Sequence, residues 1–310
     1  IIEYQLVFLG SSPYNTPALY NIMNHIDFNM GVFYPEKGIH QVPKSLATIA
    51  LKNGAKIRTN SPVKRIIVEN GSACGVELTS GEIIEADIVV SNADMHHTET
   101  ILLEEKHQQY KESYWGKKMM APSAFILYLG VDGKVPSLTH HSLLFSKNWK
   151  KNFDEIFDNP QFPSDPSLYI CTPSKTDPTV APEGKENMFV LVPIASGLEY
   201  TDAMLDEYKT KILTLIEKEM DIPNLSQRIL YSRIFCVKDF YSYYNAYKGT
   251  ALGLAHTLRQ TALFRPNNYS KKVKNLYYAG AGTNPGIGMP ICLISAELVY
   301  KRIAGISSSE

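Results

Sequence analysis

Cysteine, net charge and long apolar runs are all scarce in this sequence, and each scarcity excludes a class of protein. The 310 residues contain four cysteines, far apart and without a CxxC pair, so we expect reduced thiols and neither a disulfide framework nor a metal cluster. Basic and acidic residues number 31 each, so the net charge is zero and nothing favours binding to nucleic acid. The cysteines are Cys74, Cys171, Cys236 and Cys292.

No apolar run approaches the roughly 18–20 residues that a membrane-spanning helix needs. The longest, around residues 121–131, suits a buried strand. No secretion signal is recognisable, so we expect a cytoplasmic protein. The chain opens on Ile1, already inside an apolar segment, and we interpret it as a piece of something longer.

Hydrophobic periodicity divides the chain into α/β segments and an inserted α+β segment. Residues 87–90 form a continuous apolar run, as expected of a strand buried on both faces, and they lead into the small polar residues 91–94. The expected helices are 17–28, 42–53, 202–220 and 239–247, and the expected strands are 55–59, 63–69, 73–78, 82–86, 87–90, 123–131, 168–172, 188–193, 227–235 and 276–279.

The last forty residues carry the clearest motif. An apolar strand at 276–279 runs into a glycine-rich turn, and a helix is predicted to start at or just after Pro290. Glycines let the backbone approach a ligand closely, and a helix N-terminus presents unpaired N–H groups, so this order suits an anion. A tight-packing turn with no ligand is the alternative, and the sequence leaves both open.

This turn differs from the opening turn of a dinucleotide-binding fold. That fold requires a second parallel strand and an acidic residue about twenty residues further on, whereas the sequence ends at Glu310. The glycine spacing, Gly280-x-Gly282-x-x-x-Gly286, also departs from the fingerprint by one residue. We therefore expect a closing strand–turn–helix that completes a sheet begun elsewhere in the chain.

Several motifs, in this order, resemble the bacterial-type phytoene desaturases, which are FAD-dependent carotenoid desaturases. The resemblance covers essentially the whole chain but only the C-terminal part of such enzymes. The motifs are GVFYPEKG (31–38), Asn60 to Val63, SNAD (91–94), Thr139-His140-His141, DPSLYICTPSKTDPTVAPEGK (165–185), Phe264-Arg265-Pro266 and NLYYAGAGTNPGIGMP (275–290).

The resemblance implies a partial FAD-binding Rossmann-like domain without its N-terminal βαβ unit, and an inserted mixed-sheet substrate domain. It assigns 38–98 and 265–310 to the FAD-binding domain and 1–37 and 99–264 to the substrate domain. The N-terminus of the closing helix would stabilise the anionic reduced flavin. The implied cofactor-binding residues are Val63, Asn92, Ala93, Asp94, Gly280, Gly282, Thr283, Gly286, Gly288, Met289 and Pro290.

The implied reaction removes a hydride and a proton from adjacent carbons of a long polyene such as phytoene. Phe240, Tyr241 and Tyr244, on an aromatic helix, would line the hydrocarbon site, although a core helix is an equal alternative. No residue is assigned as catalytic. Related polyene enzymes (a diapophytoene desaturase, a carotenoid saturase or a ketolase) and a flavin-free hydrophobic-ligand module remain alternatives, and we expect this piece alone to be inactive and not to retain FAD.

Three expectations concern partners. The pairs His96-His97 and His140-His141 are not expected to bind metal, because neighbours in a strand point to opposite faces. Trp115 and Trp149, each among lysines, suggest peripheral contact with a membrane, with a solvated charged face as the alternative. The surface that a missing N-terminal part would cover predicts self-association.

Overall fold

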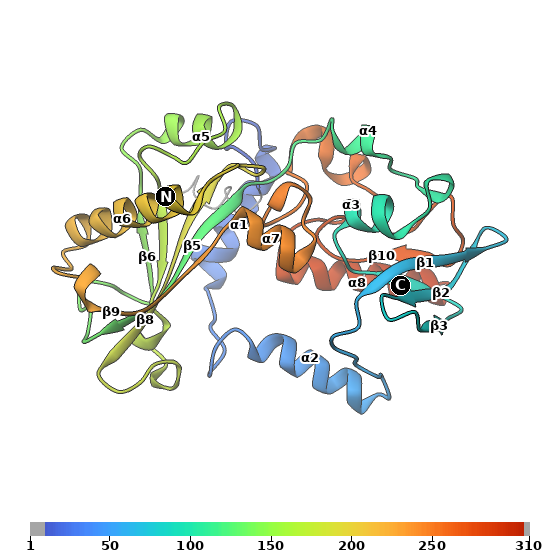
Figure 1. The fold of residues 1–310 in the computed structure, drawn as a ribbon, viewed down its shortest axis with the longest axis horizontal. Coiled ribbons are helices and arrows are strands. Elements are labelled where there is room, and N and C mark those ends of the chain that lie inside the picture. Colours follow the sequence, from blue (N-terminus) through green and yellow to red (C-terminus); the bar gives the residue numbers. More distant parts are fainter. Residues whose placement is uncertain (1–9, 307–310) are drawn as a thin grey trace. The chain divides into compact units, whose positions relative to one another are not determined.

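The computed structural model describes residues 10–306, which divide into two compact units (Figure 1). Unit 1 contains Arg58–Pro122, the residues up to Ile26 and those from Phe240 onward. Unit 2 contains Asp27–Ile57 and Ser123–Asp239. The sequence-based division into FAD and substrate domains used other boundaries, and as an assignment of roles it stays a prediction.

Unit 2 is built on one antiparallel sheet of five strands (Figure 1). The strands lie in the order β6-β7-β8-β5-β9, and β5 pairs with β8 along its full length, from Ser123 opposite Ile194 to Asp132 opposite Lys185. The bounds are β5 (Ser123–Asp132), β6 (His141–Leu144), β7 (Leu168–Cys171), β8 (Lys185–Ile194) and β9 (Ile229–Phe235).

Helix α6 (Asp202–Glu219) packs its apolar stripe against this sheet. Tyr208, Ile212 and Ile216 share a buried cluster with alternate residues of β5 and β8, as expected from a helical period facing a strand period. The Thr201 hydroxyl caps the helix by accepting the Met204 N–H at 3.3 Å. Unit 2 also contains α2 (Gln41–Lys52) and α5 (Trp149–Phe157).

Unit 1 contains two small sheets. In the first, β1 (Val63–Glu69), β2 (Ser72–Leu78) and β3 (Ile83–Glu85) form an antiparallel meander. In the second, β4 (Val89–Ser91) and β10 (Leu276–Tyr278) pair in parallel. The two sheets share a core with residues such as Ile66, Leu276 and Tyr278.

Most helices of unit 1 are short, and α8 is the long one. Unit 1 contains α1 (Ile22–His25), α3 (Met95–His97), α4 (Glu112–Trp115), most of α7 (Val237–Tyr244) and α8 (Met289–Ala304). A π-helix, Thr98–Leu102, extends α3. The remaining short helices between residues 10 and 306 are Ala18–Asn21, Ile26–Met30, Glu105–His107, Pro173–Lys175, Pro178–Val180, Ser226–Arg228, Tyr247–Gly249, Leu258–Gln260 and Ala262–Phe264.

Most predicted elements are confirmed, including the closing strand, which pairs with β4 as expected. The strand predicted at 55–59 is wrong: those residues have no partner strand, and Ile57 is 51% exposed. Burial of 87–90 on both faces is also wrong, because β4 has one neighbouring strand among the described residues and leaves Val90 46% exposed. The sequence interpretation missed β6 and α5.

Candidate functional site

The loop at 92–95 and the turn at 279–282 meet because β4 and β10 are parallel and end at the same edge. The Ala279 N–H donates to the Ser91 carbonyl at 3.0 Å, which continues the ladder one residue beyond β10. The Asn92 side-chain amide then donates to the Ala279 carbonyl at 2.8 Å. Two segments almost two hundred residues apart are thereby fixed together at the carboxyl ends of two strands, the usual ligand position in open α/β sheets.

Glycine allows these segments to approach so closely. A Cβ on Gly280 would lie 2.6 Å from the Asn92 amide nitrogen, and one on Gly282 would lie 3.0 Å from the Met95 Cβ. Gly286 is tighter still, since its Cβ would lie 2.1 Å from His256 Nε2. At all three positions the neighbour belongs to the chain itself, so the packing explanation of the glycines holds whether or not a ligand is bound.

A cavity of about 680 Å³ lies beside this junction, within unit 1. Its volume falls in the range typical of small-molecule sites. The cavity is lined by residues of both predicted sites. Those predicted to bind the cofactor are Asn92, Ala93, Asp94 and Gly282, and those predicted to bind the substrate are Phe240 and Tyr244. Its other lining residues are Met95, Tyr243, Asn245, Ala246, Thr250, Ala251, Leu252, Gly253, Ala279 and Ala281.

The remaining predicted site residues lie outside this lining. Val63 packs against the core of unit 1, and the Tyr241 side chain is 65% exposed. The Thr283 hydroxyl donates to the Pro266 carbonyl at 2.8 Å, so it serves the turn itself. The others outside the lining are Gly280, Gly286, Gly288, Met289 and Pro290.

Helix α8 begins one residue earlier than predicted, at Met289, with Pro290 in its first turn. Gly288 precedes it at φ +120°, a conformation that other residues rarely adopt. The first N–H groups of a helix have no partner within it, and Met289 is 58% exposed, so this N-terminus is accessible. That arrangement fits an anionic or dipolar group of a cofactor.

Asp94 contributes a carboxyl group to the cavity wall. Its Oδ1 accepts the His97 N–H at 3.1 Å, and its Oδ2 accepts the Tyr247 N–H at 3.4 Å. Burial raises the pKa of Asp94, and the hydrogen bonds from His97 and Tyr247 oppose that shift. The carboxylate therefore caps α3 and holds residues 245–249 against the loop at 92–95.

Arg265 is the residue that the sequence interpretation quoted in a motif but gave no role. Its side chain is 2% exposed and donates to four backbone carbonyls. The acceptors are Ala281 at 2.6 Å, Thr283 at 3.0 Å, and Gln260 and Leu254 at 3.3 Å each. One guanidinium thus fixes the closing turn to residues 254–260.

A signal for Arg265 was present in the sequence. Residues 240–296 contain no acidic residue, so an arginine buried there would have to pair with backbone carbonyls. Among the described residues no salt bridge to Arg265 occurs. The clue could not identify which carbonyls, because the four acceptors come from two separate segments.

Apolar side chains are exposed on α8 and on β4. Val90 is 46% exposed, and the side chains on α8 are 37–63% exposed. Apolar exposure on this scale is typical of a surface that another element covers. The exposed apolar residues of α8 are Met289, Leu293, Ile294, Leu298, Tyr300 and Ile303.

Trp115 corrects the sequence-based membrane argument. Its side chain is 2% exposed, and its indole N–H donates to the Tyr110 carbonyl at 3.0 Å, so it belongs to the core of unit 1 and cannot anchor a membrane surface. Between residues 10 and 306, no helix combines the length and apolar character needed to cross a bilayer.

Comparisons with known proteins agree with this architecture. An oxidoreductase from Methanosarcina mazei superposes with a TM-score of 0.63 over 97% of this chain and 64% of that protein, at 19% identity. Cyclohexylamine oxidase from Brevibacterium oxydans gives a TM-score of 0.54 over 97% of this chain and 64% of that protein, at 14% identity. The fold class expected from the sequence, a partial FAD-binding fold with an inserted sheet domain, is confirmed, although the inserted sheet is antiparallel rather than mixed.

Sequence relatives are more specific. A carotenoid 3,4-desaturase from Haloarcula japonica is 49% identical over 96% of this chain and 60% of its own length. A zeta-carotene-forming phytoene desaturase from Myxococcus xanthus is 35% identical over 97% of this chain and 58% of its own length. The chain thus spans about three fifths of these relatives. The family model for flavin containing amine oxidoreductases matches residues 3–303, and the chain belongs to that family.

Proposed function

We propose that this chain forms the larger part of an FAD-dependent desaturase that introduces a double bond into a long carotenoid polyene. One observation carries the proposal: 49% identity, over 96% of the chain, to a carotenoid 3,4-desaturase. FAD is the cofactor that this flavin-containing family implies. The reaction would take a hydride from one carbon and a proton from its neighbour, leaving a new C=C bond.

The residues of unit 1 supply a wall for such a site. Bound FAD would supply the two-electron acceptor for the hydride. Asn92, Ala281 and Gly282 would contact the cofactor at the strand ends, and the N-terminus of α8 would face its polar edge. Phe240 and Tyr244 would hold the apolar substrate and exclude water, because aromatic rings offer large apolar area with little conformational entropy.

Related polyene reactions are the alternative within the same chemistry. A 4,4'-diaponeurosporene oxygenase from Staphylococcus haemolyticus is 32% identical, and a 4,4'-diapophytoene desaturase from Methylomonas is 31% identical. The higher identity to the carotenoid 3,4-desaturase favours desaturation of a carotenoid over these reactions. The alternative outside enzymes is a non-catalytic module that binds a hydrophobic ligand without flavin. This alternative concerns the 310-residue chain on its own.

The first test is a visible absorbance scan of the purified chain after incubation with excess FAD and gel filtration, beside the full-length protein. We expect the full-length protein to retain flavin absorbance and the chain alone to lose it, because a few missing charge-assisted hydrogen bonds lower affinity by several kcal/mol. Absence of flavin from the full-length protein would refute the proposed function. Retention by the chain alone would refute only its expected loss of affinity.

Membrane contact and self-association are further parts of this proposal. A long polyene partitions into lipid, which favours an enzyme that reaches its substrate at a cytoplasmic membrane surface. The exposed apolar residues of α8 favour self-association of the isolated chain. Flotation with anionic and neutral vesicles tests the first part, and light scattering tests the second.

A further inference from the structure

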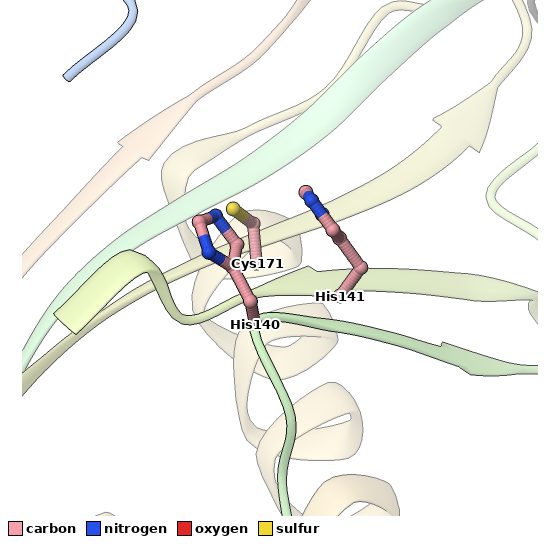
Figure 2. Close-up of side chains that lie close together, drawn as sticks. All are labelled: His140, His141 and Cys171. Atoms are coloured by element: carbon pink, nitrogen blue, oxygen red, sulfur yellow. The ribbon is translucent and has the colours of Figure 1, made fainter. Parts of the chain in front are cut away.

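Two histidines and a cysteine converge at one end of the sheet in unit 2 (Figure 2). His141 and Cys171 are register partners on β6 and β7, so their side chains share one face. His140 precedes β6, and the rule that strand neighbours point to opposite faces does not apply to it. Its ring stacks on His141 with centroids 4.2 Å apart, and one ligand atom from each of the three residues lies within 4.8 Å of the others.

Hydroxyl groups hold the far side of both imidazoles. His140 Nδ1 lies 2.6 Å from Thr176 Oγ1, and His141 Nδ1 lies 2.7 Å from the Tyr169 hydroxyl. This is the usual arrangement of histidine ligands, in which a hydrogen bond to one ring nitrogen fixes the tautomer and leaves the other to bind metal.

His140 Nε2 is the atom that needs a partner. It is buried, and no hydrogen bond to it exists within residues 10–306. A buried polar atom without a partner costs about 1–3 kcal/mol, so native structures rarely leave one. A cavity of about 670 Å³ adjoins both histidines and gives a small ion access to this end of the sheet.

We propose that His140, His141 and Cys171 form a zinc site in unit 2. Two imidazoles and a thiolate are donors that zinc prefers, whereas magnesium and calcium prefer oxygen. The fourth position would open to the cavity. The Asp177 carboxylate, which also lines this cavity, accepts the Lys37 N–H at 2.7 Å and the Thr179 N–H at 2.9 Å.

Such a zinc ion would reinforce the pairing of β6 with β7. It would join the entry to β6 with the end of β7. The Tyr34 ring packs edge-on against His140 at 4.6 Å, so the loop carrying GVFYPEKG would be fixed with them. The expected effect is to stabilise this end of the sheet, and it is independent of flavin binding by unit 1.

The test titrates chelator-treated chain with Zn²⁺ and, separately, with Co²⁺ as a spectroscopic probe. We expect one equivalent of zinc to bind and to raise Tm by about 5 °C at a hundredfold excess over Kd. Cobalt should give a thiolate-to-metal charge-transfer band. Cys171→Ser should abolish that band, and His140→Gln should weaken affinity about 100-fold.

Cys74→Ser is the matched control, because Cys74 is also a half-buried thiol in a strand but lies in unit 1. It should leave the cobalt band and the zinc affinity unchanged. If cobalt gives no band, or if the band survives in Cys171→Ser, the proposed site does not exist. Far-ultraviolet circular dichroism of each variant confirms that loss of metal is not loss of fold.

Discussion

Replacing Arg265 with methionine tests whether one buried cation holds the closing turn in place. The substitution keeps an unbranched apolar stem and removes all four hydrogen bonds to backbone carbonyls. Each bond from a charged donor contributes about 1.5 kcal/mol, so the gross loss is about 6 kcal/mol. Loss on this scale would affect the whole of unit 1.

The removed charge offsets part of that loss. Burial lowers the pKa of Arg265 to about 10, which corresponds to a penalty of roughly 3 kcal/mol on the charged form. The net loss in the free energy of unfolding is therefore about 3 kcal/mol. For a unit of this size Tm should fall by about 6–12 °C, measured by circular dichroism or differential scanning fluorimetry.

Two companion variants make the test specific. Arg259→Met changes an exposed arginine only six residues away and should alter stability by less than about 0.5 kcal/mol. Arg265→Lys keeps the charge but cannot reach carbonyls from two segments, so its Tm should lie between those of the wild type and Arg265→Met. An unchanged Tm in Arg265→Met would refute the reasoning, because the four carbonyls would then have found other partners.

Three further predictions concern packing, pH and association. Gly286→Ala should lower the free energy of unfolding by about 2 kcal/mol or more, because the new Cβ would lie 2.1 Å from His256 Nε2. Gly81→Ala is the control: its Cβ would meet nothing within 4 Å, so it should show only the smaller effect of its positive φ. Urea denaturation measures both. Burial raises the pKa of Glu99, so the folded protein binds a proton at Glu99 more tightly than the unfolded chain does. The contribution of Glu99 to stability is therefore present below the ordinary glutamate pKa and is lost as pH rises through the folded pKa. Glu99→Gln should flatten that part of the stability–pH profile. Leu293→Lys should reduce self-association in light scattering at high concentration, and an unchanged mass would contradict a role for the α8 surface.

The sequence predicted best those elements whose signal is local. Alternation of apolar and polar residues predicted β1 with its observed bounds, Val63–Glu69, and predicted β2 to within one residue. The pattern was informative because one face of each strand packs on a core. The closing strand was predicted to complete a sheet with a distant strand, and β10 does pair with β4. Residues 55–59 failed because a strand also requires a partner, which no local pattern reveals.

The candidate site was predicted only in part, for a related reason. Residues 92–94 and Gly282 were predicted to bind the cofactor, and they line one cavity with Phe240 and Tyr244. Arg265 received no role, because its acceptors are identified only when residues 254–260 and 281–283 meet.

The glycine-rich turn shows why the choice between packing and ligand binding cannot be made from glycines alone. Gly280, Gly282 and Gly286 each face another part of this chain, at 2.6, 3.0 and 2.1 Å from the position of an added Cβ, so the facing group would have to move to admit one. A larger residue at any of them would displace the loop at 92–95 or His256 first, and would weaken cofactor binding only as a consequence. Loss of flavin in such a variant therefore does not show that the glycine contacts flavin. Ala281, which lines the cavity itself, is the position where added volume would act on a ligand directly.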